Sequence, residues 1–140
     1  MSLGNSDNTL WVIPSNLNDY DIHSAFDELE RLDWHYSNSI KNVKIGDIVY
    51  IYVSKPECAI RYKCEVTKIN IPYLEIDDRK YNKKLETTGK TYFEMKLIKK
   101  FDVDLLTLDL LRKNGVKKNI QGPQRLHKET IEFVERNENR

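Results

Sequence analysis

A tryptophan surrounded by polar residues stands out in the segment Leu32–Asn38, which reads LDWHYSN. A core alone does not require a large aromatic side chain among loop-forming residues. A nucleobase that has left its strand needs a flat aromatic face to replace lost stacking and polar groups that read its edge. Trp34 and Tyr36 offer aromatic faces, and Ser37 and Asn38 offer polar groups. The segment therefore predicts a base-binding pocket; the alternative is that Trp34 anchors the core at a helix end and Tyr36 lies on the surface.

The sequence lacks the motifs of common catalytic centres, namely a glycine-rich phosphate loop, HExxH, GxSxG, or cysteines and histidines at metal-binding spacing. His23, His35 and His127 are scattered along the chain. A histidine acts as a base only beside a positioned partner. Asp33 lies close to His35 in sequence, but on most backbones the two side chains would point in different directions. We therefore expect that the chain is not an enzyme and that it uses no metal ion and no cofactor.

The charge of the chain is unevenly distributed although its formal total is only +1. The range 19–33 holds six acidic residues and one arginine, whereas the range 112–128 holds six basic residues and no acidic one. A basic segment of this kind is typical of a surface that contacts a phosphate backbone. We predict that Lys117, Lys118 and Arg125 contact the backbone of a nucleic acid. The alternative is a solvated basic loop.

The length of 140 residues with 39% hydrophobic content suits one domain, which we expect to span residues 9–140. Residues 1–8 are polar and are predicted to be a disordered N-terminal tail or a cloning scar. Cys58 and Cys64 form no CxxC pair, which favours reduced thiols. The chain has no apolar run of about 20 residues and no signal pattern, so we expect a soluble, cytoplasmic protein with no membrane partner.

Hydrophobic periodicity predicts an α+β fold with an antiparallel β-sheet and short helices. The run Ile48–Val53 is almost entirely β-branched or aromatic and predicts a buried central strand, which forms a hairpin with the alternating segment Cys58–Ile69. Further strands are expected at Thr9–Ile13 and Thr91–Phe101. Helical spacing or stop signals predict helices at Asp19–Leu32, Asp104–Leu111 and Lys128–Glu135.

The order of several motifs resembles that of EVE domains, which belong to the PUA-like fold and are related to YTH domains. The motifs are WVIPSN, YDIHSAF, LDWHYSNS, KIGDIVYIYVS and AIRYKCEVTKI. They cover Trp11–Ile69, and a looser similarity includes Gly122–Leu126, ahead of the last predicted helix. YTH domains bind N6-methyladenine in RNA. The resemblance therefore implies a PUA-like fold, that is, an α+β fold with a mixed, mainly antiparallel β-sheet or barrel flanked by short helices. It also implies a pocket for a modified base.

The resemblance also implies roles for individual residues. Trp34 matches the tryptophan that stacks on the extruded base, and Ser15 and Asn16 match the polar pair that reads the base edge at the end of the first strand. Ser37 and Asn38 match residues of the pocket floor, with Tyr36 as a second wall. The sequence departs from the YTH pattern in the hairpin turn 54–57, which has no aromatic residue to complete a methyl-binding cage. The resemblance therefore does not identify the modification.

Together these features predict a nucleic-acid-binding module that recognises a flipped, modified base, either methylated cytosine or methylated adenine, in DNA or RNA. Alternatively, the chain is the specificity domain or partner of a modification-dependent restriction nuclease, as EVE-like domains occur joined to such effectors. A third alternative is a sensor that binds a small molecule. An enzyme acting on the flipped base would need a metal or an acid–base pair near Trp34.

Overall fold

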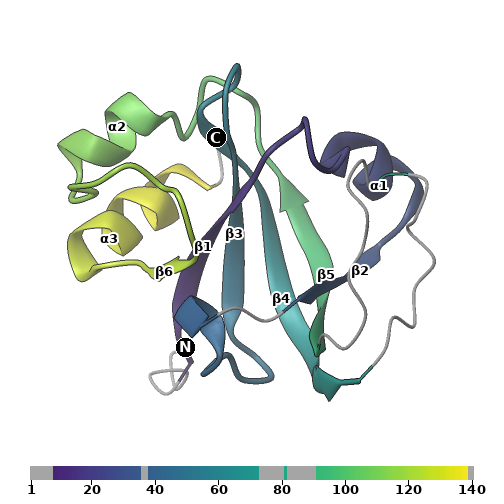
Figure 1. The fold of residues 1–140 in the computed structure, drawn as a ribbon. Helices are drawn as coiled ribbons and strands as arrows, with labels where there is room; N and C mark the ends of the chain where they lie inside the picture. Colours follow the sequence, from purple (N-terminus) through teal and green to yellow (C-terminus); the bar gives the residue numbers. More distant parts are fainter. Residues whose placement is uncertain (1–7, 36–37, 73–80, 82–90, 139–140) are drawn as a thin grey trace.

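The computed structural model describes residues 8–35, 38–72, 81 and 91–138. The described part contains helices and strands in mixed order (Figure 1). They are β1 (Leu10–Ser15), α1 (Ile22–Glu28), β2 (Arg31–His35), the 3₁₀ helix η1 (Asn38–Ile40), β3 (Ile48–Val53), β4 (Ala59–Ile71), β5 (Tyr92–Lys100), α2 (Leu108–Lys113), β6 (Gln124–Arg125) and α3 (Lys128–Asn137).

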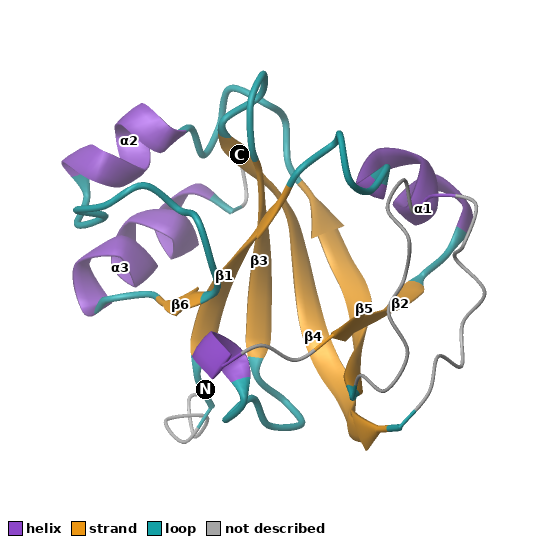
Figure 2. Ribbon diagram, viewed as in Figure 1, coloured by secondary structure: helices purple, strands orange, loops and turns teal. Residues whose placement is uncertain are grey.

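The strands form one six-stranded sheet in the order β2-β5-β4-β3-β1-β6 (Figure 2). β1 runs parallel to β3, and the other neighbouring strands are antiparallel. The parallel pair is possible because α1, β2 and η1 lie between β1 and β3 in sequence and return the chain to the same end of the sheet. The predicted mixed, mainly antiparallel α+β fold is confirmed.

Apolar side chains are buried on both faces of the sheet. The face covered by α1 holds a cluster that includes Trp11, Ile13 and Phe26. The opposite face is covered by α2 and α3 and holds Val12 and Phe133 among others. Figure 1 shows α1 on one side of the sheet and α2 and α3 on the other. Burial on two faces explains why β3 is apolar at nearly every position, whereas a strand with one exposed face alternates.

The first helix is much shorter than the predicted helix Asp19–Leu32. The Asp21 carboxylate accepts a hydrogen bond from the Ser24 backbone N–H at 3.2 Å and caps α1, and the extended backbone of Leu29 ends it. The next residues form β2, in which Leu32 pairs with Met95 of β5. The helical spacing predicted for Leu32 was wrong, because Leu32 and Trp34 alternate with Asp33 as neighbours in a strand do.

The C-terminal helices begin and end close to the predicted residues, with one exception. α2 begins four residues after the predicted Asp104, because the Thr107 hydroxyl accepts a hydrogen bond from the Leu110 N–H at 3.3 Å and provides the N-cap. Gly115 follows α2 with a φ of +112°, and an added Cβ would lie 2.6 Å from the Thr130 hydroxyl. Glycine therefore allows the tight turn that packs α3 against the end of α2.

Candidate functional site

Trp34 lies on β2, an edge strand of the sheet, and not in the loop that the sequence suggested. It pairs with Phe93 of β5 and packs, partly buried, against the core cluster under α1. Trp34 thus combines features of both sequence-based alternatives: one part of its side chain contributes to the core and another part stays accessible. The indole therefore keeps an accessible part at the edge of the sheet.

Tyr20 stands beside Trp34 and gives the site a second aromatic side chain. The two ring centroids are 5.8 Å apart and the ring planes meet at 76°. The rings of Tyr20 and Tyr81 are 6.4 Å apart at 66°, and the His35 ring lies nearly parallel to Trp34 at 6.4 Å. Sequence reasoning missed Tyr20 because it falls within the predicted helix Asp19–Leu32, whereas in the structure it lies before α1.

Ser15 and Asn16 lie at the end of β1, as predicted. The Ser15 side chain is only 3% exposed, and its hydroxyl has no hydrogen-bond partner among the residues that the structure describes. The Asn16 carbonyl accepts hydrogen bonds from the backbone N–H groups of Asp19 at 2.9 Å and Tyr20 at 3.0 Å. The Asn16 side-chain oxygen accepts from the Asn18 N–H at 2.9 Å. Asn16 therefore shapes the turn that carries Tyr20 to Trp34.

Three other predicted pocket residues are not placed in detail. Tyr36 and Ser37 lie outside the described residues, and Asn38 is described only as the first residue of η1. The sequence argument expected Asp33 and His35 to point in different directions. In β2 they are two residues apart and share a face of the strand, but Asp33 is buried whereas His35 is exposed.

The predicted backbone-binding residues lie far from Trp34 along the sheet. Lys117 and Lys118 are exposed in the segment between α2 and β6, and Arg125 is exposed on β6. The Arg125 guanidinium lies 5.2 Å from the centre of the buried Trp11 ring. β2 and β6 are the two edges of the sheet, with the other four strands between them. The structure therefore does not bring the basic residues next to Trp34.

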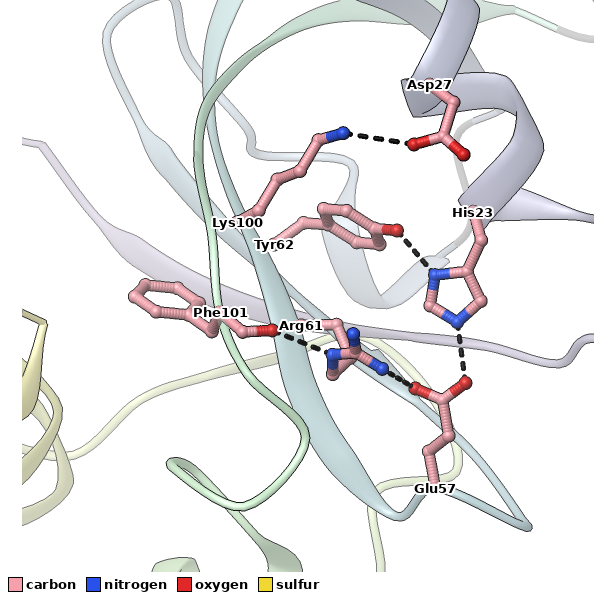
Figure 3. A pocket seen from close by; sticks show the side chains of 7 residues that line it. All are labelled: His23, Asp27, Glu57, Arg61, Tyr62, Lys100 and Phe101. Atoms are coloured by element: carbon pink, nitrogen blue, oxygen red, sulfur yellow. Dashed lines mark hydrogen bonds and ion pairs between the residues drawn. The ribbon is translucent and has the colours of Figure 1, made fainter. Parts of the chain in front are cut away.

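A separate polar hollow of about 330 Å³ opens between α1, the β3–β4 turn and the ends of β4 and β5 (Figure 3). Glu57 of the turn accepts a hydrogen bond from His23 Nε2 at 2.6 Å and forms an ion pair with Arg61. His23 Nδ1 is hydrogen-bonded to the Tyr62 hydroxyl. The lining residues are His23, Asp27, Glu57, Arg61, Tyr62, Lys100 and Phe101.

Further contacts fix the positions of these side chains. Arg61 Nε donates to the Phe101 carbonyl at 2.8 Å, and Lys100 Nζ donates to Asp27 at 3.1 Å. Burial is the main cause that raises the pKa of Tyr62 to about 12; Arg61 opposes the rise and Asp27 adds to it. Tyr62 is therefore a neutral phenol near pH 7.

Sequence reasoning missed this hollow because its members are distant in the chain. His23 is 34 residues from Glu57 and 39 from Tyr62. The described residues contain no group of three or more side chains arranged to hold a metal ion. Within the same part of the chain, no helix is long and apolar enough to cross a membrane.

No protein-family model matches the chain, and no curated protein matches it either. Solved structures do match. An X-ray structure of a Pseudomonas putida protein is 16% identical with a TM-score of 0.64, and the match covers 91% of this chain and 97% of that one. The ASCH protein from Zymomonas mobilis is 13% identical with a TM-score of 0.60, covering 91% and 94%. A tyrosine-to-phenylalanine variant of that ASCH protein is 14% identical with a TM-score of 0.64, covering 92% and 98%.

These likenesses extend over nearly the whole chain, at identities that show the fold alone. ASCH proteins have the PUA-like fold, so the expected PUA-like architecture is confirmed. The structural neighbours whose names state a domain are ASCH proteins. Membership of the EVE family stays a prediction. The chain therefore has the PUA-like fold of the ASCH proteins.

Proposed function

We propose that this chain is a nucleic-acid-binding module that recognises an extruded, modified base by stacking it on Trp34. The carrying observation is the partly accessible indole of Trp34 on the edge strand β2, with Tyr20 at 5.8 Å and nearly perpendicular to it. A flat face stacks on the base, and a perpendicular ring closes one side of the site. The PUA-like fold supports nucleic-acid binding, and the EVE resemblance supports the choice of base recognition.

The buried hydroxyl of Ser15 is the proposed reader of the base edge. A buried hydroxyl without a partner costs about 1–3 kcal/mol relative to a paired one. A bound base that exchanges a hydrogen bond with Ser15 would recover this cost. The Ser15 carbonyl accepts a hydrogen bond from the Ser54 N–H at 3.0 Å, which holds the end of β1 against the β3–β4 turn. The hydroxyl therefore sits in a fixed frame.

Tyr20 is the proposed second wall in place of the aromatic residue that the hairpin turn lacks. Glu57 in that turn is bonded to His23 and Arg61, so the turn is held to α1 and β4 by polar contacts. Because the turn does not complete the methyl-binding cage of YTH domains, the choice between methylated cytosine and methylated adenine stays open, and both are proposed ligands. We propose that the chain acts on either by binding and not by catalysis.

Lys117, Lys118 and Arg125 are proposed as a second, sequence-independent contact. Arg125 lies on β6, at the opposite sheet edge from Trp34, and Lys117 and Lys118 lie in the segment that leads into β6. A nucleic acid that touched both Trp34 and Arg125 would have to extend across the molecule. Such contacts add affinity for any sequence and do not contribute to the recognition of the base. The two surfaces can therefore be tested separately.

A binding panel tests the proposal. Short DNA and RNA oligonucleotides, single- and double-stranded, would carry cytosine, 5-methylcytosine, 5-hydroxymethylcytosine, adenine or N6-methyladenine at one central position. Because one methyl group in an apolar pocket contributes about 1–3 kcal/mol, we expect one modified base to bind roughly 10- to 200-fold more tightly than its unmodified parent. Equal affinity for all members would refute base recognition, and no binding to any member would refute the nucleic-acid module itself.

A further inference from the structure

The polar hollow in Figure 3 has no part in the proposed recognition of the base. Its residues come from three places: His23 and Asp27 from α1, Glu57 from the β3–β4 turn, and the rest from the ends of β4 and β5. A volume of about 330 Å³ accommodates a small ligand. Its lining combines ionisable groups with a buried phenol, which is the kind of cluster that marks a binding site.

The hydrogen bonds of His23 determine where its proton lies. A carboxylate only accepts hydrogen bonds, so the neutral imidazole carries its proton on Nε2 and donates it to Glu57. His23 Nδ1 must then accept, and the Tyr62 hydroxyl donates to it. In this state the Tyr62 O–H donates to His23 and does not donate to a ligand.

Protonation of His23 would reverse one of these bonds. A cationic imidazole donates from both nitrogens, so Nδ1 would donate to the Tyr62 oxygen. The Tyr62 O–H would then be released to donate to another acceptor. Tyr62 keeps its proton because burial raises its pKa to about 12, so it can serve as a donor. One proton taken up by His23 therefore adds a positive charge and makes a hydrogen-bond donor available.

The charged groups around His23 permit an anion to bind once His23 is protonated. Among the lining residues Glu57 is balanced by Arg61 and Asp27 by Lys100, so the lining is formally neutral with neutral His23 and carries +1 when His23 is protonated. The Asp21 carboxylate at the start of α1 does not line the hollow, but it adds a negative charge nearby and helps to raise the pKa of Tyr62. The Lys100 and Asp27 side chains are 52% and 70% exposed, and an exposed pair of this kind contributes little. Lys100 can therefore turn toward a bound anion at small cost.

We propose that this hollow binds a tetrahedral oxyanion, such as a phosphate monoester, together with one proton taken up by His23. Lys100 and Tyr62 donate to the anion, and Arg61 and protonated His23 provide positive charge. Glu57 holds His23 in place through Nε2. The site is separate from Trp34 and does not depend on base recognition.

Sulfate is the probe of choice, because its charge does not change in the range where histidine titrates, about pH 5 to pH 8. Binding would be followed by NMR through the His23 ring signals and by calorimetry. Because the anion favours protonated His23, we expect affinity to rise as pH falls, by up to tenfold per pH unit. Sulfate binding that is absent, or that does not change with pH, would overturn the proposal.

Two variants identify the groups involved. His23→Gln has no titrating ring, so we expect its sulfate affinity to be independent of pH. Lys100→Gln should bind sulfate more weakly at every pH while keeping the pH dependence. Lys96→Gln, an exposed lysine of β5 that does not line the hollow, is the matched control and should behave as the parent. A folded His23→Gln protein that keeps the pH dependence would refute the role of His23.

The source of the oxyanion is tested with oligonucleotides that end in a 5′-phosphate or a 5′-hydroxyl, beside inorganic phosphate. Tighter, Lys100-dependent binding of the phosphorylated end would identify the end of a nucleic acid as the ligand. Binding of inorganic phosphate with no gain from a 5′-phosphate would identify a free oxyanion. If inorganic phosphate and sulfate do not bind, and a 5′-phosphate gives no gain in binding, the site would be refuted without affecting the role of Trp34.

Discussion

Replacement of Trp34 by alanine separates stacking on a base from packing in the core. Base–aromatic stacking contributes about 1–3 kcal/mol per base, so Trp34→Ala should weaken binding of the preferred modified oligonucleotide by roughly 5- to 150-fold. Affinity for the unmodified oligonucleotide should fall much less. The discrimination between the two is therefore the quantity to measure, because it does not depend on the phosphate contacts.

The same substitution should also destabilise the protein, because Trp34 packs against the core and contacts Tyr20. A fully buried tryptophan cut to alanine costs about 3–5 kcal/mol. Since Trp34 is only partly buried, we expect about half of that, or roughly 2 kcal/mol including the lost contact with Tyr20. For a chain of this length that corresponds to a fall in melting temperature of roughly 5–10 °C.

The second tryptophan of the chain provides a matched control. Trp11 is buried, and its Nε1 donates to Asp47 at 3.0 Å. Trp11→Phe should lower stability and leave base discrimination unchanged, whereas Trp34→Phe should keep part of the affinity because the smaller ring still stacks. Fluorescence titrations of the two single-tryptophan proteins would show quenching by the modified base only where Trp34 is present. A folded Trp34→Ala protein that discriminates as well as the parent would remove Trp34 from the binding site.

Two further substitutions test the surface and the core. Replacing Lys117, Lys118 and Arg125 with glutamine should weaken binding to all sequences alike and reduce the slope of log affinity against log salt by about 2 to 3. An unchanged slope would show that the segment is a solvated loop. The control replaces three other exposed lysines, Lys41, Lys55 and Lys96. Asp47→Ala should cost about 3–5 kcal/mol in urea unfolding, because the buried carboxylate accepts three hydrogen bonds, one of them from Trp11. A loss below about 1 kcal/mol would contradict that account.

Local sequence was sufficient to predict the elements whose own side chains determine them. The run Ile48–Val53 is apolar at nearly every position because β3 is buried on both faces, and the alternation after Cys58 predicted β4 because one of its faces is partly exposed. The helix beginning at Lys128 has the expected start and extends two residues beyond the predicted end. In each case the hydrophobic period within the segment matches the period of the backbone.

The tertiary structure decided how distant residues combine. Arg31–His35 forms a strand because β5, more than 55 residues later, supplies its hydrogen-bond partners. The residues of the segment itself do not predict that pairing. The same holds for His23 and Tyr62, which meet because α1 packs across the end of β4. The sequence by itself determined that Trp34 and the basic segment exist and that each could contact a nucleic acid. The placement of Trp34 and Arg125 at opposite edges of one sheet follows from strand order, which is fixed by long-range pairing and packing and not by local periodicity.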